Sequence, residues 1–116
     1  MPQTNFYGRI SSGDAAVVRA LLQAWLCTDG LSEKLKLSGE QFVYEAEAVY
    51  VYSHAADGGA HFLLEGHRGA GLDETRAWLQ RLYDACVARG VAATLEYVAV
   101  DQAGQEISDQ YTLSEK

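Results

Sequence analysis

Residues 42–66, FVYEAEAVYVYSHAADGGAHFLLEG, decide the fold, because their composition predicts a β-hairpin. β-Branched and aromatic residues dominate both halves of this stretch, as is typical of strands. Between the halves, Asp57-Gly58-Gly59 supplies the positive φ values that a tight hairpin turn needs. We therefore expect one strand before this turn and one after it, with the rest of the chain packed against them or paired beside them.

Side chains alternate between the two faces of a strand, so each arm of the hairpin divides into two rows. In the second arm, one row is apolar and contains Phe62 and Leu64. The other row contains His61, Leu63, Glu65 and His67. The apolar row is expected to face the core, and the histidine row the opposite side.

The first arm divides less cleanly, because Val49 and Val51 share a row with Glu45 and Glu47. Burying the two valines would bury both carboxylates, which is energetically costly. Either a β-bulge near residues 46–48 changes the alternation, or the row that contains the tyrosines is the buried one. The sequence leaves both alternatives open.

The turn determines which rows share a face, because a shift of one residue moves every side chain to the other side. With a two-residue turn at residues 57–58, His54 lies opposite His61. Tyr50 and Tyr52 then join the histidine face. We favour this register over the shifted one.

Two other stretches show the 3.6-residue apolar period of amphipathic helices. The first follows a short strand at residues 5–10, and its apolar stripe consists of Val18, Leu21, Leu22, Trp25 and Leu26. The second follows residues 69–71, and its stripe consists of Trp78, Leu79, Leu82 and Cys86. Ser11 or Ser12 is expected to cap the first helix and Asp73 the second, since such side chains accept hydrogen bonds from unpaired backbone N–H groups.

The remaining stretches complete an α+β pattern. Residues 91–101 and 106–113 predict two more strands, whereas residues 34–37 are equally consistent with a strand and with a loop. We expect a single domain over residues 1–116, a two-layer sandwich in the ferredoxin-like βαββαβ order with an extra C-terminal strand. Two helices would cover one face of the antiparallel sheet and leave the other face open.

The net charge is −7, and the acids are segregated along the sequence. The stretch between Leu37 and His67 contains five acids and no Lys or Arg, and the stretch from Gly90 through Glu115 also contains five acids and no Lys or Arg. The expected sheet is therefore acidic. A field of one sign attracts a basic partner and repels an acidic one, so we expect neither nucleic acids nor anionic membranes as partners.

The sequence also bears on location. No apolar run is long enough for a membrane-spanning helix, and the N-terminus lacks the basic and apolar regions of a signal peptide. We expect a cytoplasmic protein in which Cys27 and Cys86 are reduced. Both cysteines fall on apolar stripes, which predicts buried thiols that pack as small apolar groups.

His61, Glu65 and His67 are residue types that serve in metal sites and in acid–base chemistry. Along one strand, however, about 20 Å would separate the Cα atoms of His61 and His67, which is too far for one ion. No GxSxG or HExxH motif is present, and residues 66–71 lack the Lys-Ser/Thr of a phosphate loop. We expect no metal, no cofactor and no catalytic residue.

These observations favour a small acidic domain that binds a basic protein, for example an immunity protein or inhibitor that neutralises a basic toxin or nuclease. Aromatic side chains would anchor the partner and carboxylates would select its charge. The expected contact residues are Glu45, Glu47, Tyr50, Tyr52, His61, Glu65 and His67. One alternative is a small enzyme or ligand-binding domain that uses His61 or His67 with Glu65. Another is a homodimer that assembles through the open face.

Overall fold

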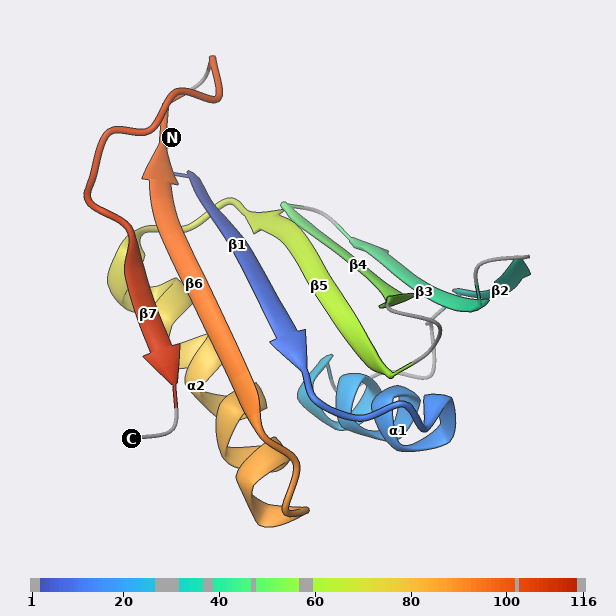
Figure 1. Cartoon of the computed structure of the whole chain (residues 1–116). Helices are drawn as coiled ribbons and strands as arrows, with labels where there is room; N and C mark the ends of the chain where they lie inside the picture. Colours follow the sequence, from blue (N-terminus) through green and yellow to red (C-terminus); the bar gives the residue numbers. More distant parts are fainter. Residues whose placement is uncertain are drawn as a thin grey trace.

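The computed structural model describes residues 3–26, 32–36, 39–46, 48–56, 60–101 and 103–114. The elements in chain order are β1 (Gln3–Ile10), α1 (Ala15–Leu26), β2 (Ser32–Lys36), β3 (Gly39–Ala46), β4 (Val49–Ala56), β5 (His61–Arg68), α2 (Leu72–Ala88), β6 (Ala93–Val100) and β7 (Tyr111–Ser114). Within these ranges the strands form one seven-stranded sheet in the order β2-β3-β4-β5-β1-β6-β7 (Figure 1). Every neighbouring pair is antiparallel.

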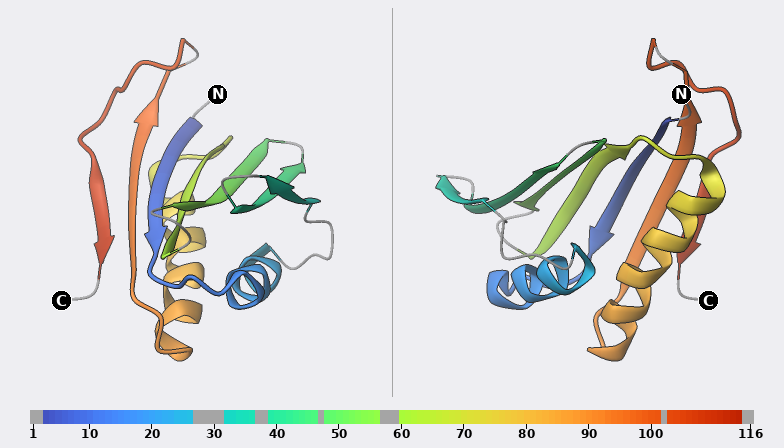
Figure 2. Two further views of the ribbon diagram at one scale, coloured as in Figure 1. Left: turned by 45° about the vertical axis from the view of Figure 1, so that its right-hand side comes forward. Right: turned by 180° about the vertical axis from the view of Figure 1, so that it is seen from behind.

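Both helices pack on one side of the sheet, as the view from behind shows (Figure 2). Both helices contact Phe6 of β1. The ring of Phe6 meets Trp25 of α1 edge-on at a centroid distance of 6.2 Å, and Trp78 of α2 edge-on at 5.4 Å. The indole nitrogen of Trp25 donates a hydrogen bond to the Trp78 carbonyl oxygen at 2.7 Å. The guanidinium of Arg68 lies over the Trp78 ring at 4.9 Å.

The predicted helical stripes are confirmed. On α1 the buried side chains are Val18, Leu21, Leu22 and Trp25, and on α2 they are Thr75, Leu79, Leu82 and Cys86. The expected caps are different, however. Asp14, rather than a serine, accepts hydrogen bonds from the backbone of Ala16 and Val17. The cap of α2 is Gly71 with no side-chain hydrogen bond, so Asp73 lies inside the first turn.

The expectation of one long strand before the Asp57 turn is wrong. The chain reverses between Ala46 and Val49, which are paired, and so divides this stretch into β3 and β4. Ala48 has a φ of 63°, which places a non-glycine residue in the left-handed region. A turn between β3 and β4, not a bulge, thus resolves the conflict between burying Val51 and exposing Glu45. Val51 is buried on the helix side, while Glu45 lies exposed on the other side.

The pairing of β4 with β5 is displaced by two residues from the favoured register. His54 lies opposite Leu63 instead of His61, and the last pair before the turn is Ala56 with His61. The turn residues 57–59 lie outside the described residues. Because a displacement of two residues keeps every side chain on its face, Tyr50 and Tyr52 still share the face of Glu65 and His67, as predicted.

The α+β class and the antiparallel sheet with two helices packed on it are confirmed. The element order differs from βαββαβ with one extra strand, because four strands lie between the helices where two were expected. For residues 34–37 the sequence is consistent with a strand and with a loop. Residues 34–36 form part of a strand, since β2 spans Ser32–Lys36. The added strands β2 and β3 extend the sheet beyond β4.

Gly66 provides a test of the close packing beneath the sheet. A Cβ at Gly66 would collide with the Tyr50 carbonyl oxygen and lie 2.7 Å from Cζ of Phe6, whereas a Cβ at Gly71 would meet nothing within 4 Å. We expect Gly66→Ala to lower the free energy of unfolding by at least about 2 kcal/mol, and Gly71→Ala to change it by about 1 kcal/mol or less. Urea unfolding measures both variants. Equal midpoints for Gly66→Ala and the wild type would contradict this packing.

Candidate functional site

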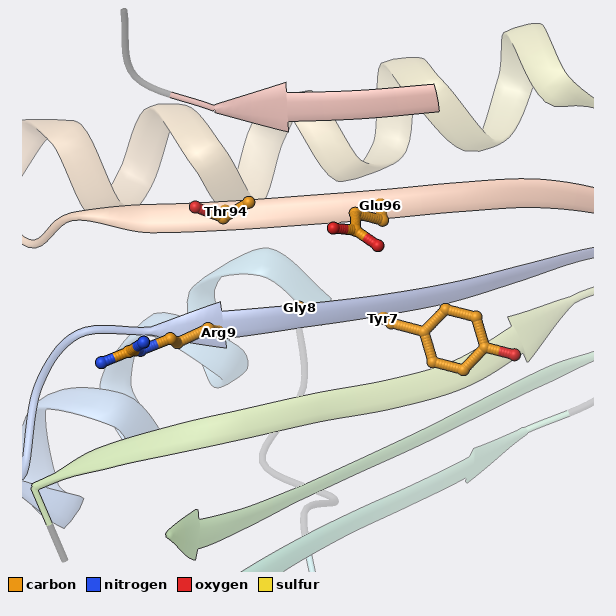
Figure 3. A pocket seen from close by; sticks show the side chains of 5 residues that line it. All are labelled: Tyr7, Gly8, Arg9, Thr94 and Glu96. Carbon is orange, nitrogen blue, oxygen red and sulfur yellow. The ribbon is translucent and has the colours of Figure 1, made fainter. Parts of the chain in front are cut away.

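The open face of the sheet is the face opposite the helices. Along β1, Phe6 and Ile10 are buried on the helix side, and the alternating residues Tyr7 and Arg9 are exposed on the open face. The strand pairings then assign residues of the neighbouring strands to the same face, because directly paired residues in an antiparallel sheet lie side by side. Figure 3 shows Tyr7 and Arg9 on the side of the sheet away from the helices.

A central row of alternating phenol and carboxylate groups crosses the open face. Tyr52 of β4 pairs with Glu65 of β5, Glu65 pairs with Tyr7 of β1, and Tyr7 pairs with Glu96 of β6. Tyr7 is 43% exposed, which is high for a side chain in the middle of a sheet. Burial, and then the charge of Glu65, raise the pKa of Tyr52, so its phenol stays protonated at neutral pH.

Aromatic and histidine rings stack beside this central row. The rings of Tyr50 and His67, which pair across β4 and β5, stack with a centroid distance of 5.6 Å. The rings of Tyr52 and His54 stack at 5.2 Å along β4. Glu45 of β3 pairs with Tyr50 and adds a carboxylate at the end of that row. These two stacked pairs add aromatic surface to the open face, beside the carboxylates of Glu45 and Glu65.

The structure brings together most of the contact residues expected from the sequence. Glu45, Tyr50, Tyr52, Glu65 and His67 share the open face. His61 belongs to the same row by register, but its side chain is only 6% exposed and offers little surface to a partner. Glu47 lies outside the described residues.

Sequence reasoning missed three residues of the open face, namely Tyr7, Arg9 and Glu96. The alternation in residues 5–10 correctly places Tyr7 and Arg9 opposite Phe6 and Ile10. No local pattern, however, shows that β1 lies between β5 and β6. Arg9 shares the open face with the carboxylates Glu45, Glu65 and Glu96, so the open face carries charges of both signs.

Two hollows adjoin Tyr7 on the open face. The large hollow has a volume of about 380 Å³ and is lined by Tyr7, Gly8, Arg9, Thr94 and Glu96 (Figure 3). The small hollow has a volume of about 170 Å³ and is lined by Tyr7, Gly8, His54, Leu63, Leu64 and Glu65. The large hollow therefore offers both a guanidinium and a carboxylate, whereas the small hollow offers one carboxylate among aromatic and aliphatic groups.

The two charged side chains of the large hollow, Arg9 and Glu96, differ in their partners. Figure 3 shows Arg9 and Tyr7 directed apart along β1, with Thr94 and Glu96 beside them on β6. The side-chain amide of Gln110 donates a hydrogen bond to a carboxylate oxygen of Glu96. In the described part of the chain, no ion pair joins Arg9 to a carboxylate. Within the same ranges, no group of three His, Cys, Asp or Glu residues is placed to hold a metal ion.

Comparison with known proteins yields no assignment of family. No protein-family model, curated protein sequence or solved structure matches the chain. Neither α1 nor α2, the helices of the described ranges, is long and apolar enough to cross a membrane. The function therefore has to be inferred from the geometry of the open face.

Cys86 lies apart from the open face, in the core beneath α2. Its side chain is fully buried, and burial raises the pKa of its thiol to about 11. Cys27 lies outside the described residues. Because the thiolate is the reactive form, Cys86 is a packing residue and not a nucleophile.

We expect Cys86 in a Cys27→Ser variant to react with a thiol reagent at pH 8 only after urea unfolds the chain. Absorbance of the released chromophore measures this reaction, and rapid reaction of the folded variant would contradict the burial of Cys86.

The folded-state pKa of about 11 for Cys86 lies above the ordinary value of 9.0. The unfolded chain therefore loses the proton first, and the contribution of Cys86 to stability falls as pH rises from about 9 to about 11. Cys86→Ala should lack this contribution.

Proposed function

We propose that this protein binds a basic protein partner through the open face of its sheet. The observation that supports this proposal is the central row, in which Tyr52, Glu65, Tyr7 and Glu96 alternate across four adjacent strands. Tyrosines on strands lose little conformational freedom on binding and provide large contact areas. Carboxylates between them favour a partner of positive charge and reject one of negative charge.

The concrete form of this proposal is an immunity protein or inhibitor that neutralises a basic toxin or nuclease in the cytoplasm. A nuclease has to bind phosphates, so its active site is lined by Lys and Arg. Glu45, Glu65 and Glu96 on the open face would complement such a surface, and the net charge of −7 would accelerate the encounter. Arg9 would then pair with an acidic residue of the partner.

The two alternatives receive less support from the geometry. In a symmetric homodimer built through the open face, the same carboxylates of both copies would share one interface and repel each other. The small-enzyme alternative requires a histidine free to act with Glu65. His61 is buried, and the ring of His67 is stacked on Tyr50.

We further infer that the four central strands and the two helices make up a ferredoxin-like unit. Its basis is the position of β1 between β5 and β6, the two strands that α2 connects. In this interpretation, β2, β3 and β7 are additions at the two edges of the sheet. They widen the sheet, which suits a docking role.

The proposal predicts salt-sensitive capture of a basic protein from the cells that make this chain. We expect Glu45→Lys combined with Glu65→Lys to reduce the amount captured by about tenfold or more, because both reversals place like charges against the partner. The control is Glu74→Lys combined with Asp84→Lys, which changes the net charge equally at exposed positions of α2, outside the open face. Capture measured by quantitative mass spectrometry should be equal for the control and the wild type.

The measurement contradicts the proposal if the captured proteins are not basic. The measurement also contradicts the proposal if the amount captured is the same for both double variants and does not fall at high salt. Circular dichroism spectra of the variants show whether each has folded before capture is compared.

A further inference from the structure

We infer that the small hollow beside Tyr7 receives an arginine side chain of the partner, with the guanidinium against the Tyr7 ring and the Glu65 carboxylate. This inference rests on the proposed function and names the anchor through which the basic partner is held. It goes beyond charge complementarity because it assigns one side-chain type to one place on the open face.

The lining of the small hollow matches the two parts of an arginine side chain. Leu63, which is 36% exposed, and the ring of His54 provide apolar surface for the methylene groups. Glu65 provides the one carboxylate of the hollow. A volume of about 170 Å³ suits a single side chain rather than a larger ligand, since sites for drug-sized molecules start at about 300 Å³.

The arrangement around Glu65 favours a flat cation. Tyr7 and Tyr52 pair with Glu65 from opposite sides, so a phenol ring flanks the carboxylate on each neighbouring strand. A guanidinium can stack on an aromatic face and direct two N–H groups to one carboxylate, whereas the ammonium of lysine is a compact, strongly hydrated charge. Because Tyr52 stays protonated at neutral pH, Glu65 is the one negative charge among these three groups.

Arg9 does not occupy the small hollow. It lines the large hollow on the other side of Tyr7, where Figure 3 shows it directed away from the Tyr7 ring. Glu96 lies in that same large hollow. The two sides of Tyr7 therefore differ in charge: the small hollow has His54 but no Lys or Arg in its lining, whereas the large hollow has Arg9.

The probe for this site is arginine with blocked ends, N-acetyl-arginine N-methylamide, titrated into the ¹⁵N-labelled protein. We expect saturable shifts of the amide signals of Gly8, His54 and Leu63. Citrulline with the same blocked ends has the same shape without the charge, and we expect no saturable shifts from it. In Glu65→Gln the dissociation constant of the arginine probe should rise by about threefold or more, and in Tyr7→Leu by a similar factor.

The matched control is Glu74→Gln, which removes one exposed carboxylate from α2, outside the open face, and should leave the dissociation constant unchanged. An amide spectrum like that of the wild type shows that each variant is folded. Equal binding of citrulline, an unchanged dissociation constant in Glu65→Gln, or the absence of saturable shifts with arginine would each overturn the inference.

The experiment separates failure of this inference from failure of the proposed function. Capture of a basic partner that is lost in Glu45→Lys with Glu65→Lys, but retained in Glu65→Gln and in Tyr7→Leu, would support the docking face and overturn the arginine anchor. Arginine binding in the small hollow without capture of any basic protein would support the anchor chemistry and contradict the proposed function.

Discussion

The packing of Phe6 against two tryptophans is the interaction on which the arrangement of layers depends. Trp25 comes from α1 and Trp78 from α2, so one strand residue holds both helices to the same side of the sheet. Gly66 on the adjacent strand leaves room for the Phe6 ring. Aromatic rings bury large apolar areas, and edge-on contacts add to that stabilisation. Because both helices of the described residues pack on this side, neither of them covers the opposite face of the sheet.

The open face acquires its chemistry from the insertion of β1 between two acid-bearing strands. Glu65 of β5 and Glu96 of β6 would be neighbours if their strands were paired directly. With β1 between them, two strand spacings of about 4.8 Å each separate their backbones, which weakens their repulsion. Tyr7 fills the position between them. The same insertion that relieves repulsion therefore builds the alternating row to which we assign binding.

Local patterns in the sequence are sufficient to predict the helices and the two faces of β5, because periodicity is a local property. They fail at the reversal before β4, where no glycine, asparagine or proline marks the turn and Ala48 adopts the left-handed conformation. The displaced pairing of β4 with β5 leaves the alternation unchanged, so no pattern distinguishes it from the favoured register. Tyr7 and Arg9 could not be assigned to the site of Glu65, because the order of strands depends on contacts between distant segments.

The central claim is that β1 lies between β5 and β6 and presents Tyr7 to both. Nuclear Overhauser contacts between backbone protons of paired strands test it directly in solution. We expect contacts from Tyr7 and its neighbours in β1 to Glu65 on one side and to Glu96 on the other. Direct backbone contacts between β5 and β6, with none from Tyr7 to either strand, would contradict it.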